Sequence, residues 1–139
     1  MPTLGGAAMG MPEALRTASE GYDAYTKGDV EAMVATWGPD ITFHVPGRSV
    51  LAGTFRGRDE VLAFLGRLAD RSGGTFQLEV HDILASEEHV VVLCREFAQR
   101  NGRTIDLPAA HVCHADQDGR FSEVWFLVED QGRLDEFWT

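Results

Sequence analysis

The sequence predicts an α+β fold: a long, curved antiparallel sheet wrapped as a cone around N-terminal helices. Two observations favour this class. Helical patterns fill the first half of the chain, and strand patterns with a period of two fill most of the second half. A cone of this kind encloses a pocket, where a few polar side chains on an apolar wall suffice to bind or transform a ligand.

Length and charge limit the classes of protein that the chain can be. Its 139 residues fit a single domain at 11–139, preceded by a flexible tail at 1–10 that lacks the features of a signal peptide. The formal net charge of −10 and the scattered arginines disfavour nucleic acid and membranes as partners. No apolar run reaches the roughly 18 residues of a membrane helix. We therefore expect a soluble, cytoplasmic protein.

Two helices are predicted before the first strand. Pro12 suits the first turn of the first helix, and Gly28 ends it. Asp29 is a good N-cap for the second helix, which is expected to bury Trp37 and to stop at Pro39.

A short strand, a third helix and four longer strands follow. The third helix opens at Asp59 and Glu60, whose charges complement the helix dipole. Asn101-Gly102 is a strong hairpin signal. The last residues are expected to return Phe137 and Trp138 to the domain. The predicted strands cover residues 41–45, 76–81, 90–97, 104–114 and 121–128. Residues 90–97 form a nearly continuous apolar run, as expected of a central strand that is covered on both faces.

With these elements in place, the chain resembles the nuclear transport factor 2-like superfamily, in its branch of SnoaL-like polyketide cyclases and ketosteroid isomerases. The likeness covers about residues 13 to 130 and implies the cone-shaped fold and a homodimer, for which Trp125 and Leu127 offer outward apolar side chains. Members include isomerases, dehydratases, cyclases, epoxide hydrolases and non-catalytic modules, so the fold alone does not choose an activity. The residues that carry the likeness are Gly28-Asp29-Val30, Trp37, Phe43–Gly47, Gly53, Gly57-Arg58 and Asp118-Gly119-Arg120.

The resemblance also bears on individual positions. His111 falls where ketosteroid isomerases place the acidic group that donates to a developing oxyanion. Val45 stands where they have the aspartate base, and Gly21 stands where they have a tyrosine. Because valine cannot move a proton, steroid-type isomerisation by that mechanism is not expected. Tyr25 matches a pocket tyrosine of scytalone-dehydratase-like members, although Thr26 replaces the neighbouring acid.

His111 is the first catalytic candidate. It shares a strand face with Leu107, Ala109 and Cys113, an apolar row that is expected to line the pocket. An imidazole in such a place can take up or release a proton near neutral pH. The alternative is a core histidine whose nitrogens are satisfied by hydrogen bonds.

Tyr25 and Asp130 are further catalytic candidates. Tyr25 lies on the inward stripe of the first helix, where its phenol can donate to a substrate oxygen. Tyr22 competes for that place, because sequence does not fix the rotation of a helix to better than about one residue. Asp130 has the parity of the inward residues of strand 121–128, so it either reaches the pocket rim or caps the C-terminal turn.

His44 is the remaining catalytic candidate. Strict alternation turns it away from the pocket if Phe43 and Val45 point inward, whereas a bulge near Pro46 would re-aim it. The expected substrate-binding residues are mostly apolar or aromatic: Tyr22, Trp37, Phe43, Val45, Leu107, Val124 and Phe126.

No metal or cofactor is expected. Cys113 and His114 point to opposite faces of one strand, so a single metal would not bind both without distortion. Cys94 and Cys113 are expected to be buried free thiols. The leading hypothesis is an enzyme that isomerises, cyclises or dehydrates a small hydrophobic carbonyl compound, with His111 as base or hydrogen-bond donor. A module of the same fold that only binds a ligand or only dimerises remains open.

Overall fold

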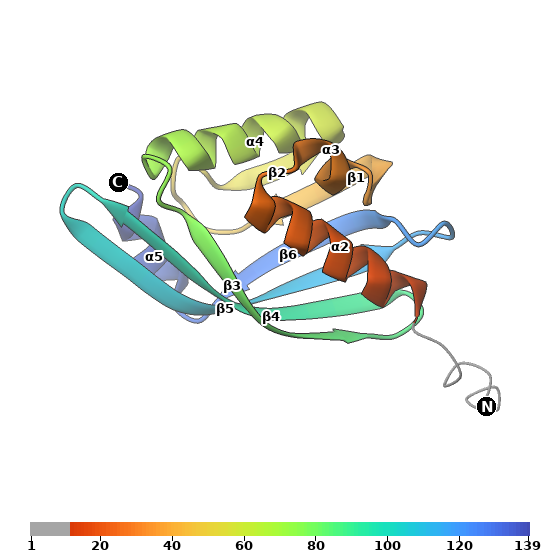
Figure 1. The fold of residues 1–139 in the computed structure, drawn as a ribbon. Helices are drawn as coiled ribbons and strands as arrows, with labels where there is room; N and C mark the ends of the chain where they lie inside the picture. The colour runs from red at the N-terminus through yellow and green to blue at the C-terminus, as the bar shows by residue number, and fades with distance from the viewer. Residues whose placement is uncertain (1–11) are drawn as a thin grey trace.

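The computed structural model describes residues 12–139 and folds them into helices packed on one sheet (Figure 1). The predicted tail at 1–10 lies outside the described residues, and the single domain over 11–139 stays a prediction. The elements in chain order are α2 (Glu13–Lys27), α3 (Val30–Val34), β1 (Trp37–Val45), β2 (Gly53–Arg56), α4 (Arg58–Arg71), β3 (Gln77–Ala85), β4 (His89–Arg100), β5 (Arg103–Ala115), β6 (Phe121–Val128) and α5 (Gln131–Phe137).

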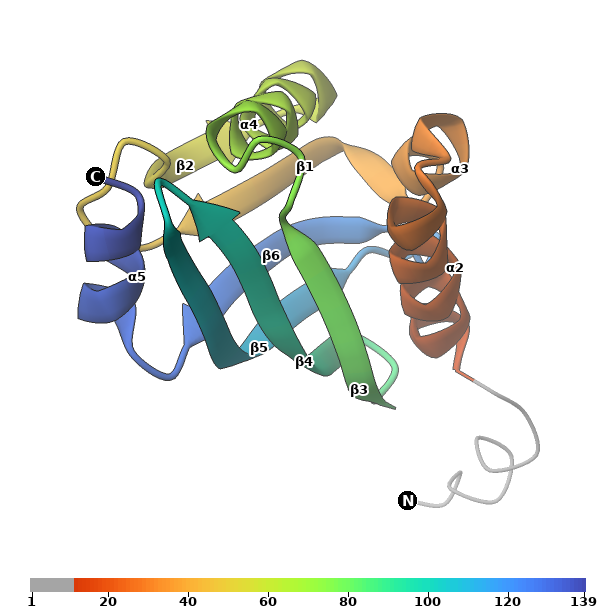
Figure 2. The same cartoon turned by 60° about the vertical axis from the view of Figure 1, so that its left-hand side comes forward.

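The strands of residues 12–139 form one six-stranded, curved and unclosed sheet in the order β2-β1-β6-β5-β4-β3. Helix α4 packs near β1 and β2, and α2 packs near β3 and β4, so the helices cover the hollow face of the sheet (Figures 1 and 2). This arrangement confirms the predicted α+β cone. One pair differs from the expected antiparallel sheet: β1 and β6 run parallel, which the long connection through the intervening strands permits.

Local sequence accounts for the first two helices. Gly28 ends α2 in the left-handed conformation, with φ of 73°, and its N–H donates to the carbonyls of the last turn. Asp29 caps α3 by accepting a hydrogen bond from the Ala32 N–H at 3.1 Å. Gly21 has a different role, because a Cβ built there would lie 2.9 Å from the Thr36 hydroxyl. A larger residue at this position would force α2 away from the segment before β1.

Two elements differ from the sequence prediction. Helix α3 ends at Val34, and Trp37 and Pro39 belong to strand β1 rather than to the end of a helix. The pairing of β1 with β6 is irregular between Trp37 and Thr42, and proline is tolerated at such an irregularity because it has no N–H to donate. Strand β2 was not predicted, because its four residues are mostly exposed and carry no alternating apolar pattern.

Several other predictions are confirmed. Asn101 and Gly102 join β4 to β5 with positive φ angles of 52° and 74°, as a tight hairpin requires. Phe137 and Trp138 are both 4% exposed at the C-terminal end. Leu127 is half-exposed on the outer face of the sheet, but homodimerisation through that face stays a prediction. Over residues 12–139, no helix is long and apolar enough to cross a membrane.

The core lies between the inner face of the sheet and the helices. Inward residues of β4 alternate regularly, with Val90 and Val92 fully buried and Cys94 almost so. Cys113 on β5 is also buried, and both cysteines are free thiols, as predicted.

We expect Val90→Ala to lower the free energy of unfolding by about 2 kcal/mol, because it removes two buried methylene-sized groups and leaves a cavity. The matched control is Val50→Ala, at a position that is 65% exposed, where a change within about 0.5 kcal/mol is expected. Urea unfolding of both variants measures the difference. Equal losses at the two positions would contradict the described core.

Candidate active site

A cavity of about 120 Å³ lies between the inner face of the sheet and helices α2, α3, α4 and α5. Its wall is mainly apolar and aromatic, with contributions from Phe64, Phe76, Phe121 and Trp138 beside the residues predicted from sequence. Polar groups on the wall are few, and they come from Tyr22, Tyr25, Thr36, Ser49, Glu96, His111 and Gln131.

His111 is the centre of the polar part of the cavity. The Tyr22 hydroxyl lies 2.7 Å from its Nδ1, and Glu96 Oε2 lies 3.2 Å from its Nε2. The Cys94 sulfur is a weaker neighbour of Nε2, at 3.8 Å. His111 is 2% exposed and Glu96 is 7% exposed. These three residues, the Tyr22–His111–Glu96 triad, bring together helix α2, strand β5 and strand β4.

The protonation of Tyr22 sets the direction of the hydrogen bonds. Burial raises the pKa of Tyr22 well above its ordinary value, so the phenol stays neutral. A neutral phenol donates its O–H to Nδ1 when the imidazole proton is on Nε2, and Nε2–H then donates to the Glu96 carboxylate. Both ring nitrogens of His111 are thereby satisfied inside the protein.

Tyr25 supplies a second phenol to the cavity wall. Across residues 12–139 its hydroxyl makes no hydrogen bond to another residue, so it is available to a ligand. Burial, with a smaller contribution from the charge of Glu96, raises the pKa of Tyr25 to about 12. Tyr25 therefore presents a protonated O–H donor at neutral pH.

The aromatic surroundings hold the His111 ring in place. Phe126 packs edge-on against it, with ring centroids 4.6 Å apart, and the Tyr22 ring lies at 5.7 Å. Burial also raises the pKa of Cys94 and that of Cys113 to about 12, so neither thiol ionises near neutral pH.

Most of the residues predicted from sequence to form the wall do line the cavity: Tyr22, Trp37, Phe43, Val45, Val124 and Phe126. Leu107 does not, although its parity along β5 is the inward one. It is 1% exposed and belongs to the packed hydrophobic core.

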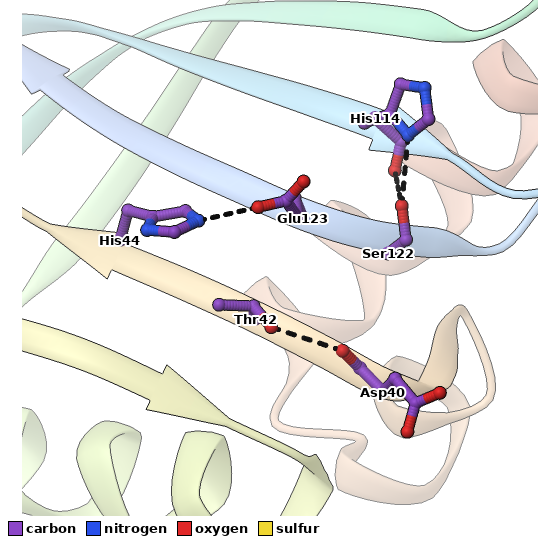
Figure 3. Close-up of polar contacts among 6 residues, drawn as sticks. All are labelled: Asp40, Thr42, His44, His114, Ser122 and Glu123. Carbon is purple, nitrogen blue, oxygen red and sulfur yellow. Dashed lines mark hydrogen bonds and ion pairs between the residues drawn. The ribbon is translucent and has the colours of Figure 1, made fainter.

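His44 lies outside the cavity wall. Its Nε2 is 2.8 Å from Glu123 Oε2 on the neighbouring strand (Figure 3), and its ring stacks on Trp125 with centroids 5.0 Å apart. The register of β1 with β2 is regular from Thr42 to Val45, so no bulge re-aims the side chain. Alternation thus sends Phe43 and Val45 inward and His44 to the opposite face.

Asp130 is also absent from the wall. It is the N-cap of α5, where its Oδ1 accepts a hydrogen bond from the Arg133 N–H at 3.0 Å. The capping alternative accounts for this residue, and the structure does not bring it to His111.

Glu96 is the titratable wall residue that sequence reasoning missed. The segment 90–97 was interpreted as a continuous apolar run covered on both faces, yet β4 alternates, with Val90, Val92, Cys94 and Ala98 buried on the inner side. Glu96 has the same parity as these four residues. An acidic residue in step with a buried apolar row was therefore the available signal.

A curved, unclosed sheet with helices in its hollow and an internal cavity defines the NTF2-like class of α+β proteins. Residues 18–124 match the SnoaL-like domain, and the chain belongs to that family. An uncharacterized protein of Mycobacterium tuberculosis is 30% identical over 119 residues, which cover 85% of this chain and 90% of the relative.

Two solved structures are similar over nearly the whole chain. Bal32a, from a soil-derived mobile gene cassette, has a TM-score of 0.86 at 30% identity, covering 91% of this chain and 97% of Bal32a. A protein of unknown function with a cystatin-like fold from Xanthomonas campestris has a TM-score of 0.85 at 29% identity, covering 92% and 98%.

The chain has two tyrosines, and both lie on the cavity wall. At a pH of about 10, which is the ordinary pKa of a phenol, we expect the native protein to show little tyrosinate absorbance, because burial disfavours the anion. Tyr25 should ionise at about pH 12. The contribution of these groups to stability is complete below the unfolded pKa and is lost as pH rises through the folded value. Ultraviolet titration measures this, with urea-unfolded protein as control; native tyrosines that titrate like the unfolded ones would contradict the burial.

Asp130→Ala should lower the free energy of unfolding by about 1 kcal/mol, because the first turn of α5 loses its side-chain acceptor. Asp130→Asn keeps an acceptor oxygen and is expected to retain most of that stability. Denaturant unfolding of the two variants, together with any ligand-binding assay of the cavity, separates a cap from a site residue. Unchanged stability in Asp130→Ala would refute the capping role, and a binding defect in Asp130→Asn at unchanged stability would show that the carboxylate also serves the cavity.

Proposed function

We propose that the protein is a cofactor-independent acid–base enzyme that isomerises, cyclises or dehydrates a small hydrophobic carbonyl compound in its cavity. The observation that carries this proposal is the Tyr22–His111–Glu96 triad, a set of hydrogen-bonded titratable groups buried on an otherwise apolar wall. Burying such groups is costly, and they gather at functional sites more often than elsewhere.

Glu96 is the proposed proton acceptor. Its Oε2 is held by His111, whereas Oε1 makes no hydrogen bond to any of the residues that the structure describes, and Glu96 lines the cavity. A carboxylate with one oxygen fixed and the other facing a ligand is well placed as a general base. His111 orients the carboxylate through Nε2, and Tyr22 in turn orients the His111 ring through Nδ1.

Tyr25 is the proposed oxygen-binding group. Its O–H would donate a hydrogen bond to the substrate carbonyl oxygen. That hydrogen bond becomes stronger as the oxygen gains negative charge in the apolar cavity. In the first step the α-C–H bond breaks, the proton moves to Glu96, the C–H electron pair forms a C=C bond, and the carbonyl π pair moves to oxygen. Return of the proton from Glu96 to another carbon isomerises the enolate. Attack of the enolate on a second carbonyl carbon cyclises it, and the new alkoxide oxygen takes the proton from Glu96. Loss of a β-hydroxyl dehydrates the enolate, and that group takes the proton from Glu96 and leaves as water.

The departures from the ketosteroid isomerase pattern fit this assignment. Val45 lines the cavity from β1, so the position of the expected aspartate base is an apolar wall. Glu96 reaches the same cavity from β4. Gly21 stands where ketosteroid isomerases have a tyrosine, and the next residue, Tyr22, supplies a phenol to the cavity wall. The acid–base groups are thus supplied from different positions of the same fold.

The proposal is tested by deuterium exchange at the α-carbon of small cyclic ketones in D2O, followed by NMR. We expect the wild-type protein to accelerate exchange over buffer, and Glu96→Gln to lower the rate by about 10²-fold or more, because it removes the proton acceptor. Tyr25→Phe removes the donor to the carbonyl oxygen and should lower the rate by about 10- to 100-fold.

Glu79→Gln is the matched control, because Glu79 is an exposed acid on the neighbouring strand β3. It should exchange like the wild type. Ketones that bind in the cavity but exchange no faster than in buffer would refute the enzyme and leave a binding module of the same fold.

A further inference from the structure

The charge that the cavity wall can carry comes from two side chains. Among the described residues that line it there is no lysine or arginine. Tyr22 and Tyr25 are neutral near pH 7, because burial raises the pKa of both. Formal charge on the wall is therefore decided by His111 and Glu96 alone.

The number of protons that His111 and Glu96 share determines the net charge of the wall. A neutral imidazole beside an ionised carboxylate carries a charge of −1, and one added proton, on either group, brings the pair to zero. A positive wall would require both groups to be protonated at once, which leaves a buried imidazolium without a counter-charge. Burial therefore disfavours a positive charge on the wall.

The hydrogen-bonding groups show the same bias. Both nitrogens of His111 are occupied, one by Tyr22 and one by Glu96, so the ring has no N–H to offer an anion. Thr36 donates to the Met33 carbonyl, and Gln131 donates to Pro46 and Asp135. The ligand therefore meets a free carboxylate oxygen and neutral donors such as the Tyr25 phenol and the Ser49 hydroxyl, with no cation beside them. Neutral donors without a positive charge do not compensate for stripping the water from a carboxylate or a phosphate.

We propose that the cavity selects uncharged carbonyl compounds and excludes carboxylates and phosphates. This deepens the proposed function and rests on it for the place where the substrate binds. The substrate is then a ketone, ester or lactone without a free acid. The reaction that supplies it must leave any acidic group esterified, lactonised or removed.

The net charge of the whole protein is a competing cause of anion exclusion. A formal charge of −10 repels anions at long range, but dissolved salt screens that field, with a Debye length of about 3 Å at about 1 M ionic strength. A buried pair such as His111 and Glu96 is screened much less. Selectivity that persists in concentrated salt therefore originates in the cavity.

The test compares acetophenone with benzoate, which have similar size and the same aromatic carbonyl but differ by one negative charge. Protein-observed NMR titration near pH 7 in about 1 M NaCl, where surface charge is screened, gives both dissociation constants. We expect acetophenone to bind at least about 10-fold more tightly than benzoate, because desolvation of the buried anion is not compensated. Equal binding, tighter binding of benzoate, or failure of acetophenone to bind would overturn the inference.

Variants locate the cause. Glu96→Gln removes the carboxylate charge with little change in size, and it should reduce the preference for acetophenone by about 5-fold or more. Glu79→Gln makes the same change in net charge on the exposed surface of β3 and should leave the preference unchanged. An unchanged ratio in Glu96→Gln would refute the role of this side chain.

The two experiments test the enzymatic proposal and the ligand class independently. Charge selectivity without deuterium exchange would remove the enzymatic proposal and keep the ligand class. Exchange by a cavity that binds benzoate as well as acetophenone would keep the enzyme and remove the ligand class.

Discussion

A histidine that is 2% exposed needs a hydrogen-bond partner for each ring nitrogen, and this requirement joins three separate elements. His111 on β5 is satisfied by Tyr22 from α2 on one side and by Glu96 from β4 on the other. The contact between α2 and the sheet is thus partly polar, in a cavity whose other walls are apolar. The position of α2 over the sheet determines whether the triad forms, and Gly21 allows the close approach that this position needs.

The sequence predicted the cone and most of the cavity wall, because both follow from simple periodicity. Alternation along β1 and β6 placed Phe43, Val45, Val124 and Phe126 on one side, and all four line the cavity. His111 was found by its inward parity. Its partners were not found, because a contact between residues 22 and 111 depends on helix rotation and on how far α2 lies above the sheet, and neither is encoded locally.

The errors also have physical causes. Glu96 was passed over because β4 was interpreted as apolar on both faces, although only every second residue of it is buried. Trp37 was assigned to a helix because Pro39 looked like a helix stop, whereas β1 tolerates the proline at an irregular part of its pairing with β6. His44 and Asp130 carry the side chains of catalytic residues but are engaged elsewhere, by Glu123 and by the first turn of α5.

The placement of the indole rings has a practical consequence. Of the three tryptophans in the chain, Trp37 and Trp138 border the cavity, and Trp125 stacks on His44 at the other face of the sheet. Two of the three native fluorophores therefore share the environment of whatever occupies the cavity, and the third is an internal reference. The emission of the unlabelled protein is an intrinsic sensor of occupancy, suited to screening compounds without attaching a dye.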